Sequence, residues 1–158
     1  MSVLIVIAND YDIASQQANI KRAIEYVYKK FSRTRIRIDW FLSGSSRSQS
    51  SISEAQLMSE AISTVSESFI TINKYNWHYI HDNRSTNLKD NFARLNEWLE
   101  FNRPYQEIQV VTSNYLASLI AETIIPGNKF KWIYSDLVEP NSVIAVDSDK
   151  RQRIANVV

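Results

Sequence analysis

Cysteine is absent from the 158-residue sequence, and glycine occurs only twice. The absence of Cys excludes disulfides, thiolate zinc sites, iron–sulfur clusters and cysteine nucleophiles. Average usage of about 7% would give roughly eleven glycines in a chain of this length. Because Gly44 and Gly127 lie far apart, neither a dinucleotide-binding fingerprint nor a Walker phosphate loop can be assembled. Both of these glycine-dependent phosphate sites are therefore excluded.

An excess of charge is also absent, since 18 Lys and Arg residues stand against 17 Asp and Glu residues. A formal net charge of +1 gives no overall attraction to nucleic acid or anionic lipid, so we expect neither partner. The longest apolar run near the start, Val3 to Ala8, is too short for a signal-peptide core or a membrane span. We therefore expect a soluble, cytoplasmic protein. Frequent Ile, Ser and Asn indicate an A+T-rich coding region, such as that of a virus or parasite.

The length predicts a single domain over residues 1–158, because a typical domain has about 100 to 200 residues. Val3 to Ala8 is apolar at consecutive positions, as in the central strand of a parallel sheet that helices cover on both faces. Apolar steps of three and four predict helices over about 13–30, 52–72, 88–103 and 116–124. Further strands are predicted over 34–42, 77–81, 108–112 and 130–134.

Two local details accompany these elements. Residues 34–42 alternate between apolar and charged side chains, so this strand is expected toward a sheet edge with one wet face. Ser51 and Glu54 match a capping box at the start of the second helix.

Strand and helix alternate along residues 1–134, and residues 135–158 are expected to form a less regular C-terminal appendix. Parallel strands need long crossovers, which helices supply. The predicted fold is α/β: a three-layer, Rossmann-like arrangement with a mainly parallel five-stranded sheet and helices on both faces.

In such sheets, ligands bind beyond the carboxyl ends of the strands, and here the loops that follow the strands are polar. Helix N-termini next to these loops favour an anionic or sugar-like ligand. The alternative is that the same Ser, Asn and Asp residues only cap helices. The candidate ligand-binding residues are Asn9, Asp10, Ser43, Gly44, Ser45, Arg84, Ser85, Asn87, Asn91, Thr112 and Ser113.

Four segments resemble successive motifs of the YdcF/SanA/ElyC-like domain family, in the same order and with similar spacing. They are Ser43–Ser45, Ser53–Met58, Asp82–Asn91 and Ile108–Tyr115. The resemblance extends from Val3 to about Tyr134. It implies a Rossmann-like domain whose bacterial members are linked to envelope biogenesis, with S-adenosylmethionine binding in the family and no reaction generally established.

The sequence departs from the family pattern at several positions. Ala8-Asn9-Asp10 replaces a Gly-rich turn, and Leu88, Leu116 and Leu119 replace the family's Thr, His and Arg. These changes remove a hydroxyl, a general acid or base and an anion clamp. They predict a divergent member of the family.

The resulting hypothesis is a small-molecule binding protein for an anionic or nucleotide-like ligand, with S-adenosylmethionine as the ligand that the resemblance implies. One alternative is a non-catalytic interaction protein that has lost this ligand site. Another is a Mg²⁺-dependent phosphotransferase, because Asp10 and Asp12 have the spacing of two carboxylates that share a hard cation. Whether the protein is an enzyme, and whether it forms a homo-oligomer, both stay open.

Two smaller groups of residues complete the candidates. His78 and His81 lie three residues apart in a predicted strand and so face opposite sides, which leaves only His81 as a candidate acid or base. The basic cluster Lys29, Lys30, Arg33, Arg35 and Arg37 has aromatic neighbours that would suit nucleic acid, although a solvated surface is the favoured interpretation.

Overall fold

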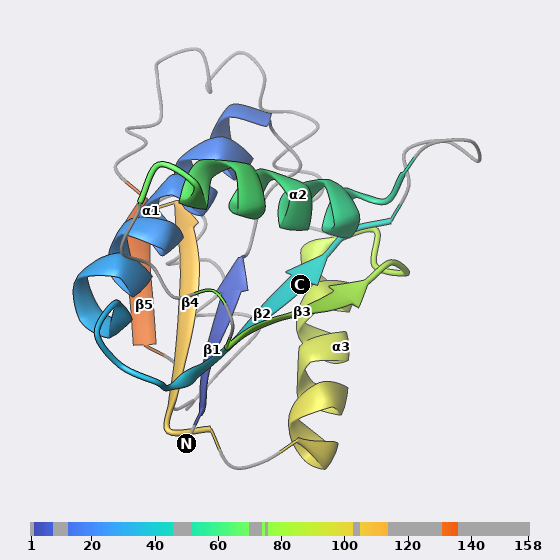
Figure 1. The fold of residues 1–158 in the computed structure, drawn as a ribbon. Helices are drawn as coiled ribbons and strands as arrows, with labels where there is room; N and C mark the ends of the chain where they lie inside the picture. Colours follow the sequence, from blue (N-terminus) through green and yellow to red (C-terminus); the bar gives the residue numbers. More distant parts are fainter. Residues whose placement is uncertain are drawn as a thin grey trace.

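A computed structural model describes residues 2–7, 13–45, 52–69, 74, 76–102, 105–113 and 131–135 (Figure 1). The elements are β1 (Ser2–Ile7), α1 (Ile13–Phe31), β2 (Arg37–Ser43), α2 (Glu54–Ser66), β3 (Trp77–Asp82), α3 (Leu88–Phe101), β4 (Glu107–Ser113) and β5 (Lys131–Ser135). The helix predicted over 116–124 and the segment after Ser135 lie outside the described residues. Within the described ranges, no helix combines the length and the apolar character that a membrane crossing requires.

The strands are hydrogen-bonded in the order β3-β2-β1-β4-β5, and each neighbouring pair is parallel. β1 lies between β2 and β4, as its continuous apolar sequence predicts, and Val3 to Ile7 are all buried. Side chains are described for β1 to β4, which carry the core, whereas β5 is described by its backbone pairing with β4. The predicted α/β class with a parallel sheet is confirmed.

β2 lies next to the edge strand β3, toward one edge of the sheet as its alternating sequence predicts, but it is not an edge strand itself. It pairs with β1 on one side and with β3 on the other. Its second face is not wet, contrary to the prediction, because Asp39 and Phe41 on that face are 2% and 3% exposed. The alternation reflects a buried charge with hydrogen-bond partners rather than a solvated face.

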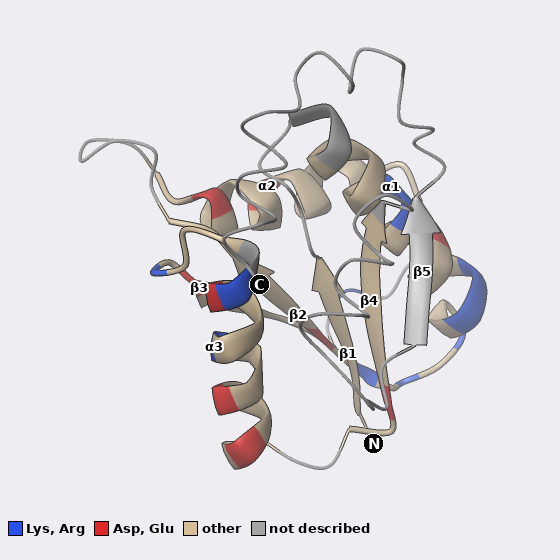
Figure 2. Ribbon diagram, turned by 180° about the vertical axis from the view of Figure 1, so that it is seen from behind, with Lys and Arg blue, Asp and Glu red and all other residues tan. Residues whose placement is uncertain are grey.

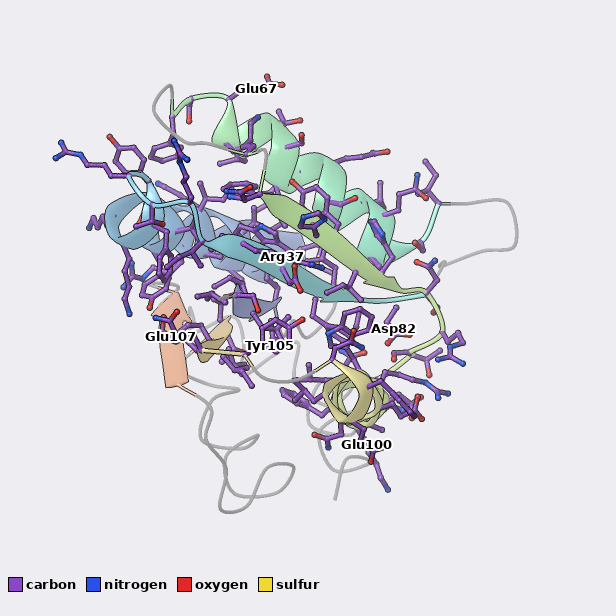
Figure 3. The ribbon with its side chains drawn as sticks, turned by 60° about the horizontal axis from the view of Figure 1, so that its bottom comes forward. Arg37, Glu67, Asp82, Glu100, Tyr105 and Glu107 are labelled. Carbon is purple, nitrogen blue, oxygen red and sulfur yellow. The ribbon has the colours of Figure 1, made fainter. Side chains whose placement is uncertain are left out.

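Helices cover the two faces of this sheet unequally (Figure 3). α1 and α2 lie together on one face, where their apolar side chains form one core cluster with Val3, Ile5, Ile7, Trp40 and Leu42. α3 lies on the opposite face and buries Phe92, Leu95 and Leu99. The strand side chains that alternate with the core cluster, such as Asp39 and Ser43, therefore face the α3 side.

α2 starts two residues later than the predicted capping box. Ser53, not Ser51, is its N-cap, and the Ser53 hydroxyl accepts a hydrogen bond of 3.1 Å from the backbone N–H of Gln56. Ser53 and Gln56 have the Ser-x-x-Gln spacing of a capping box. The sequence therefore contains this motif, but it starts two residues after the predicted one. α2 also ends at Ser66, earlier than the predicted range 52–72.

At the amino-terminal end of the sheet, two members of the basic cluster pair with buried carboxylates. Lys30 Nζ on α1 lies 2.7 Å from Glu107 Oε1 on β4, and this hydrogen bond raises the lysine pKa. Arg37 Nε donates to Asp39 Oδ1 at 2.7 Å. These pairs give both residues a structural role, which differs from the solvated surface that was the favoured interpretation of the cluster.

Candidate functional site

The carboxyl ends of β3, β2 and β4 place polar side chains in one row on the α3 side of the sheet. Ser43 is the register partner of Asp82, so adjacent strands bring these two residues side by side, about 5 Å apart. Leu42 and Val111 both pair with Ile7, so Ser43 and Thr112 each follow at the next level. Two strand spacings separate Ser43 from Thr112, or roughly 10 Å. Asp82, Ser43 and Thr112 are defined here as the polar row, and all three are buried.

Asn91 joins this row from the first turn of α3. α3 starts beyond the carboxyl end of β3 and packs against the same face, so its first turn lies at the level of the row (Figures 1 and 3). The Asn91 side chain is only 8% exposed, on the buried face that also carries Phe92 and Leu95. Asn91 is therefore a further buried polar residue at the same end of the sheet as the row.

Two oxygens at this end are buried without a hydrogen-bond partner among the residues that the structure describes. They are Ser43 Oγ and Asn91 Oδ1, and their residues are 7% and 8% exposed. Native proteins pair most buried polar atoms, with protein groups or with water, because an unpaired one costs about 1–3 kcal/mol. Gln16 Nε2, in the first turn of α1 at the same end of the strands, is also buried and unpaired.

Asp82 is held in place by the loop that follows it. Its carboxylate accepts hydrogen bonds from the Ser85 hydroxyl and, at 3.1 Å, from the backbone N–H of Arg84. Asn87 then caps α3 by accepting a 2.8 Å hydrogen bond from the N–H of Asp90. Ser85 and Asn87, both candidate ligand-binding residues, thus have structural roles in ordering this loop.

Gly44 and Ser45 connect the same loop to α2. The backbone N–H of Gly44 donates to Asp82 O at 2.9 Å, and that of Ser45 donates to Ser85 O at 3.0 Å. A Cβ on residue 44 would lie 2.5 Å from the Cβ of Glu54, so only glycine fits this close approach. Glycine is needed here for packing against α2.

The N-terminus of α2 does not offer the free N–H groups that were predicted to attract an anion. The N–H groups of Glu54 and Ala55 donate to Ser45 O and Gly44 O, both at 3.2 Å, and that of Gln56 donates to Ser53 Oγ. Since the first-turn donors are already engaged, helix α2 cannot bind an anion through them without breaking these bonds. The α2 donors that this part of the predicted anion site would use are therefore occupied.

The structure thus brings together most of the candidates whose positions it describes. Arg84 differs from the others, because it is exposed and its guanidinium lies 4.0 Å from the carboxylate of Glu97 on α3. Ser113 ends β4, and its side chain is outside the described residues. Outside them as well are Asn9, Asp10, Asp12, Leu116, Leu119 and the side chain of Leu88.

The sequence analysis placed the segment Asp82–Asn91 in this region but did not include Asp82, Asn83 or Gln16 among the candidate ligand-binding residues. Asn83 accepts a 2.6 Å hydrogen bond from the Ser53 hydroxyl, which fastens the α2 cap to the loop after β3. The position of Asp82 at the end of a strand was a usable signal, since strand ends line the crevice in this type of sheet. Gln16 gave no signal beyond its polarity.

His81 does not face the row. Its Nε2 lies 3.0 Å from the Ser59 hydroxyl on α2, and its ring is next to Tyr79, so it belongs to the α2 side of β3. In the part of the chain that the structure describes, no three His, Cys, Asp or Glu residues are grouped as metal ligands would be.

Comparisons of this chain with known protein families, with curated proteins and with solved structures find no match.

Proposed function

We propose that this protein binds a small nucleoside-like ligand at the carboxyl end of its sheet, over the polar row. One observation carries the proposal: Ser43 Oγ and Asn91 Oδ1 are buried there without a partner among the described residues. A ligand that hydrogen-bonds to both atoms would remove the cost of leaving them unpaired. The order of the strands supports the same location, because it reverses between β1 and β4, where open α/β sheets bind ligands.

The proposal includes a Rossmann-like arrangement and a divergent relationship to the YdcF/SanA/ElyC-like family. Support comes from the segments that carry the resemblance, since Ser43–Ser45 and Asp82–Asn91 are joined by backbone hydrogen bonds at one end of the sheet. S-adenosylmethionine is the first ligand to test on this basis. Its ribose hydroxyls and amino groups can donate hydrogen bonds to the unpaired oxygens.

A thermal-shift screen tests the proposal, with S-adenosylmethionine, nucleosides, nucleotides and phosphosugars as probes. A ligand specific for the native state raises the unfolding midpoint, and at 100 times its Kd it adds about 2.7 kcal/mol of stability. We expect a hit whose effect is reduced in Ser43→Ala. The control is Ser68→Ala, which alters an exposed serine at the far end of α2. A flat screen, or a hit that both variants retain equally, would refute the proposal.

A further inference from the structure

The chemistry of the polar row restricts the class of ligand, an inference that rests on the proposed binding function. One of the helix starts at this end, that of α2, donates its first N–H groups to Gly44 O, Ser45 O and Ser53 Oγ. The N–H groups of Gly44 and Ser45 are likewise bound to the loop after β3. Phosphate sites in related architectures depend on such N–H groups, because they supply donors and the positive end of a helix dipole.

Two buried carboxylates lie at this end of the sheet. The Asp82 side chain is 7% exposed, and its hydrogen bonds come from neutral donors, the Arg84 N–H and the Ser85 hydroxyl. Glu54, at the start of α2 next to Gly44, is also buried. Carboxylates in partly desolvated surroundings repel an anion more strongly than they would in water.

Among the described residues, the cations near this end are at the surface rather than in the row. Arg84 is exposed and lies close to Glu97, and Lys89 is exposed next to Asp90 on α3. The basic residues of α1 and of the turn into β2 are prominent in Figure 2, and that turn lies at the opposite end of the strands. The described residues therefore offer no buried cation to neutralise a phosphate over the row.

The unpaired atoms favour a ligand that donates hydrogen bonds rather than an anion such as phosphate. Asn91 Oδ1 can only accept, and Ser43 Oγ can accept or donate. A hydroxyl or amino group is the matching partner for both. We infer that the site takes a neutral or cationic compound bearing hydroxyl or amino groups, of the nucleoside or sugar class, and discriminates against its phosphorylated form.

Calorimetric titration of the full chain with two matched pairs tests this inference: adenosine against AMP, and glucose against glucose 6-phosphate. We expect at least one unphosphorylated member to bind about 10-fold more tightly than its phosphorylated partner. Asn91→Leu, which removes the acceptor but keeps the side-chain size, should weaken that binding ~3- to 10-fold. The matched control is Asn96→Leu at an exposed position of the same helix.

Two further variants make the outcomes separable. Ser43→Ala removes the second unpaired oxygen, and it should lower affinity even if Asn91→Leu does not fold. Asp82→Asn removes the carboxylate charge and should narrow the difference between adenosine and AMP. If a phosphorylated compound binds more tightly than its unphosphorylated partner, and Ser43→Ala weakens that binding, this inference is overturned but the proposed binding function is not. No binding by any of the four compounds, or binding that neither Ser43→Ala nor Asn91→Leu weakens, would overturn this inference, whereas the proposed function is overturned only if the thermal-shift screen with S-adenosylmethionine is flat as well.

Discussion

The hydroxyl of Tyr105 donates a 2.6 Å hydrogen bond to the carboxylate of Asp39, a residue that is only 2% exposed. Trp98 on α3 donates its indole N–H to the same tyrosine oxygen at 2.9 Å. Arg37 supplies the opposite charge from the other side of the carboxylate. Tyr105 therefore links the end of α3 to β2 through a buried charge (Figure 3).

Replacement of Tyr105 by Phe should destabilise the protein by about 1–3 kcal/mol, because Asp39 and Trp98 would each lose a partner in a buried setting. Chemical denaturation measures this loss. Tyr28→Phe is the matched control, since the Tyr28 ring packs against Phe69 at 4.9 Å and that contact survives. The control should change stability by less than about 0.5 kcal/mol. Equal effects of the two variants would contradict the role of the Asp39 hydrogen bond.

Stability should also fall at alkaline pH, in part through Tyr105. Burial, and then the hydrogen bond to Asp39, raise the pKa of Tyr105 above its usual value of 10.0. The folded state holds the proton more tightly than the unfolded state, so this contribution is complete below pH 10 and is lost as the pH rises further. Denaturation curves between pH 8 and 11.5 should show the decline, which should be shallower in Tyr105→Phe. A decline of the same slope in both proteins would contradict the assignment.

Gly44 should not tolerate a side chain. In Gly44→Ala the new Cβ would lie 2.5 Å from Glu54 Cβ, and we expect a loss of about 1–3 kcal/mol. The second variant is Gly44→Ala combined with Glu54→Gly, which removes the opposing Cβ. Its loss should be smaller than the sum of the two single losses by about 1 kcal/mol. Strict additivity in the double-mutant cycle would show that the clash is not the cause.

The α2 cap offers a separate test. Ser53→Ala removes both the cap on Gln56 and the 2.6 Å hydrogen bond to Asn83, so we expect a loss of about 1–2 kcal/mol. Ser53→Thr keeps the hydroxyl and should retain most of the stability. Thermal unfolding of the two variants side by side distinguishes these cases, and an equally large loss in Ser53→Thr would point to packing instead of capping.

The sequence allowed the class of fold to be predicted because its apolar pattern is local and strong. The unbroken run in β1 required burial on both faces, and β1 does lie inside the sheet. The same reasoning gave a wrong result for β2, because the sequence pattern makes Asp39 look solvent-facing. Its hydrogen-bond partner Tyr105 lies 66 positions away in the sequence. A partner so distant in the chain cannot be read from periodicity.

The candidate site was predictable in its position but not in its chemistry. The strand-end rule correctly gathered Ser43, Asn91 and Thr112 at one end of the sheet. It also assigned free N–H groups to α2, whereas the carbonyls of Gly44 and Ser45 occupy them. Which donors are engaged depends on the path of the loop, which residue types alone do not determine.

The most direct test of ligand binding over the polar row is chemical-shift mapping of the ¹⁵N-labelled protein with adenosine and with S-adenosylmethionine. Binding there predicts shifts concentrated on the Asn91 side-chain amide and on the backbone amides of Ser43, Gly44 and Thr112, with no change at Lys29 or Arg35 at the other end of the molecule. An unchanged spectrum with both compounds, or shifts confined to α1 and the turn after it, would contradict a ligand site at this end of the sheet.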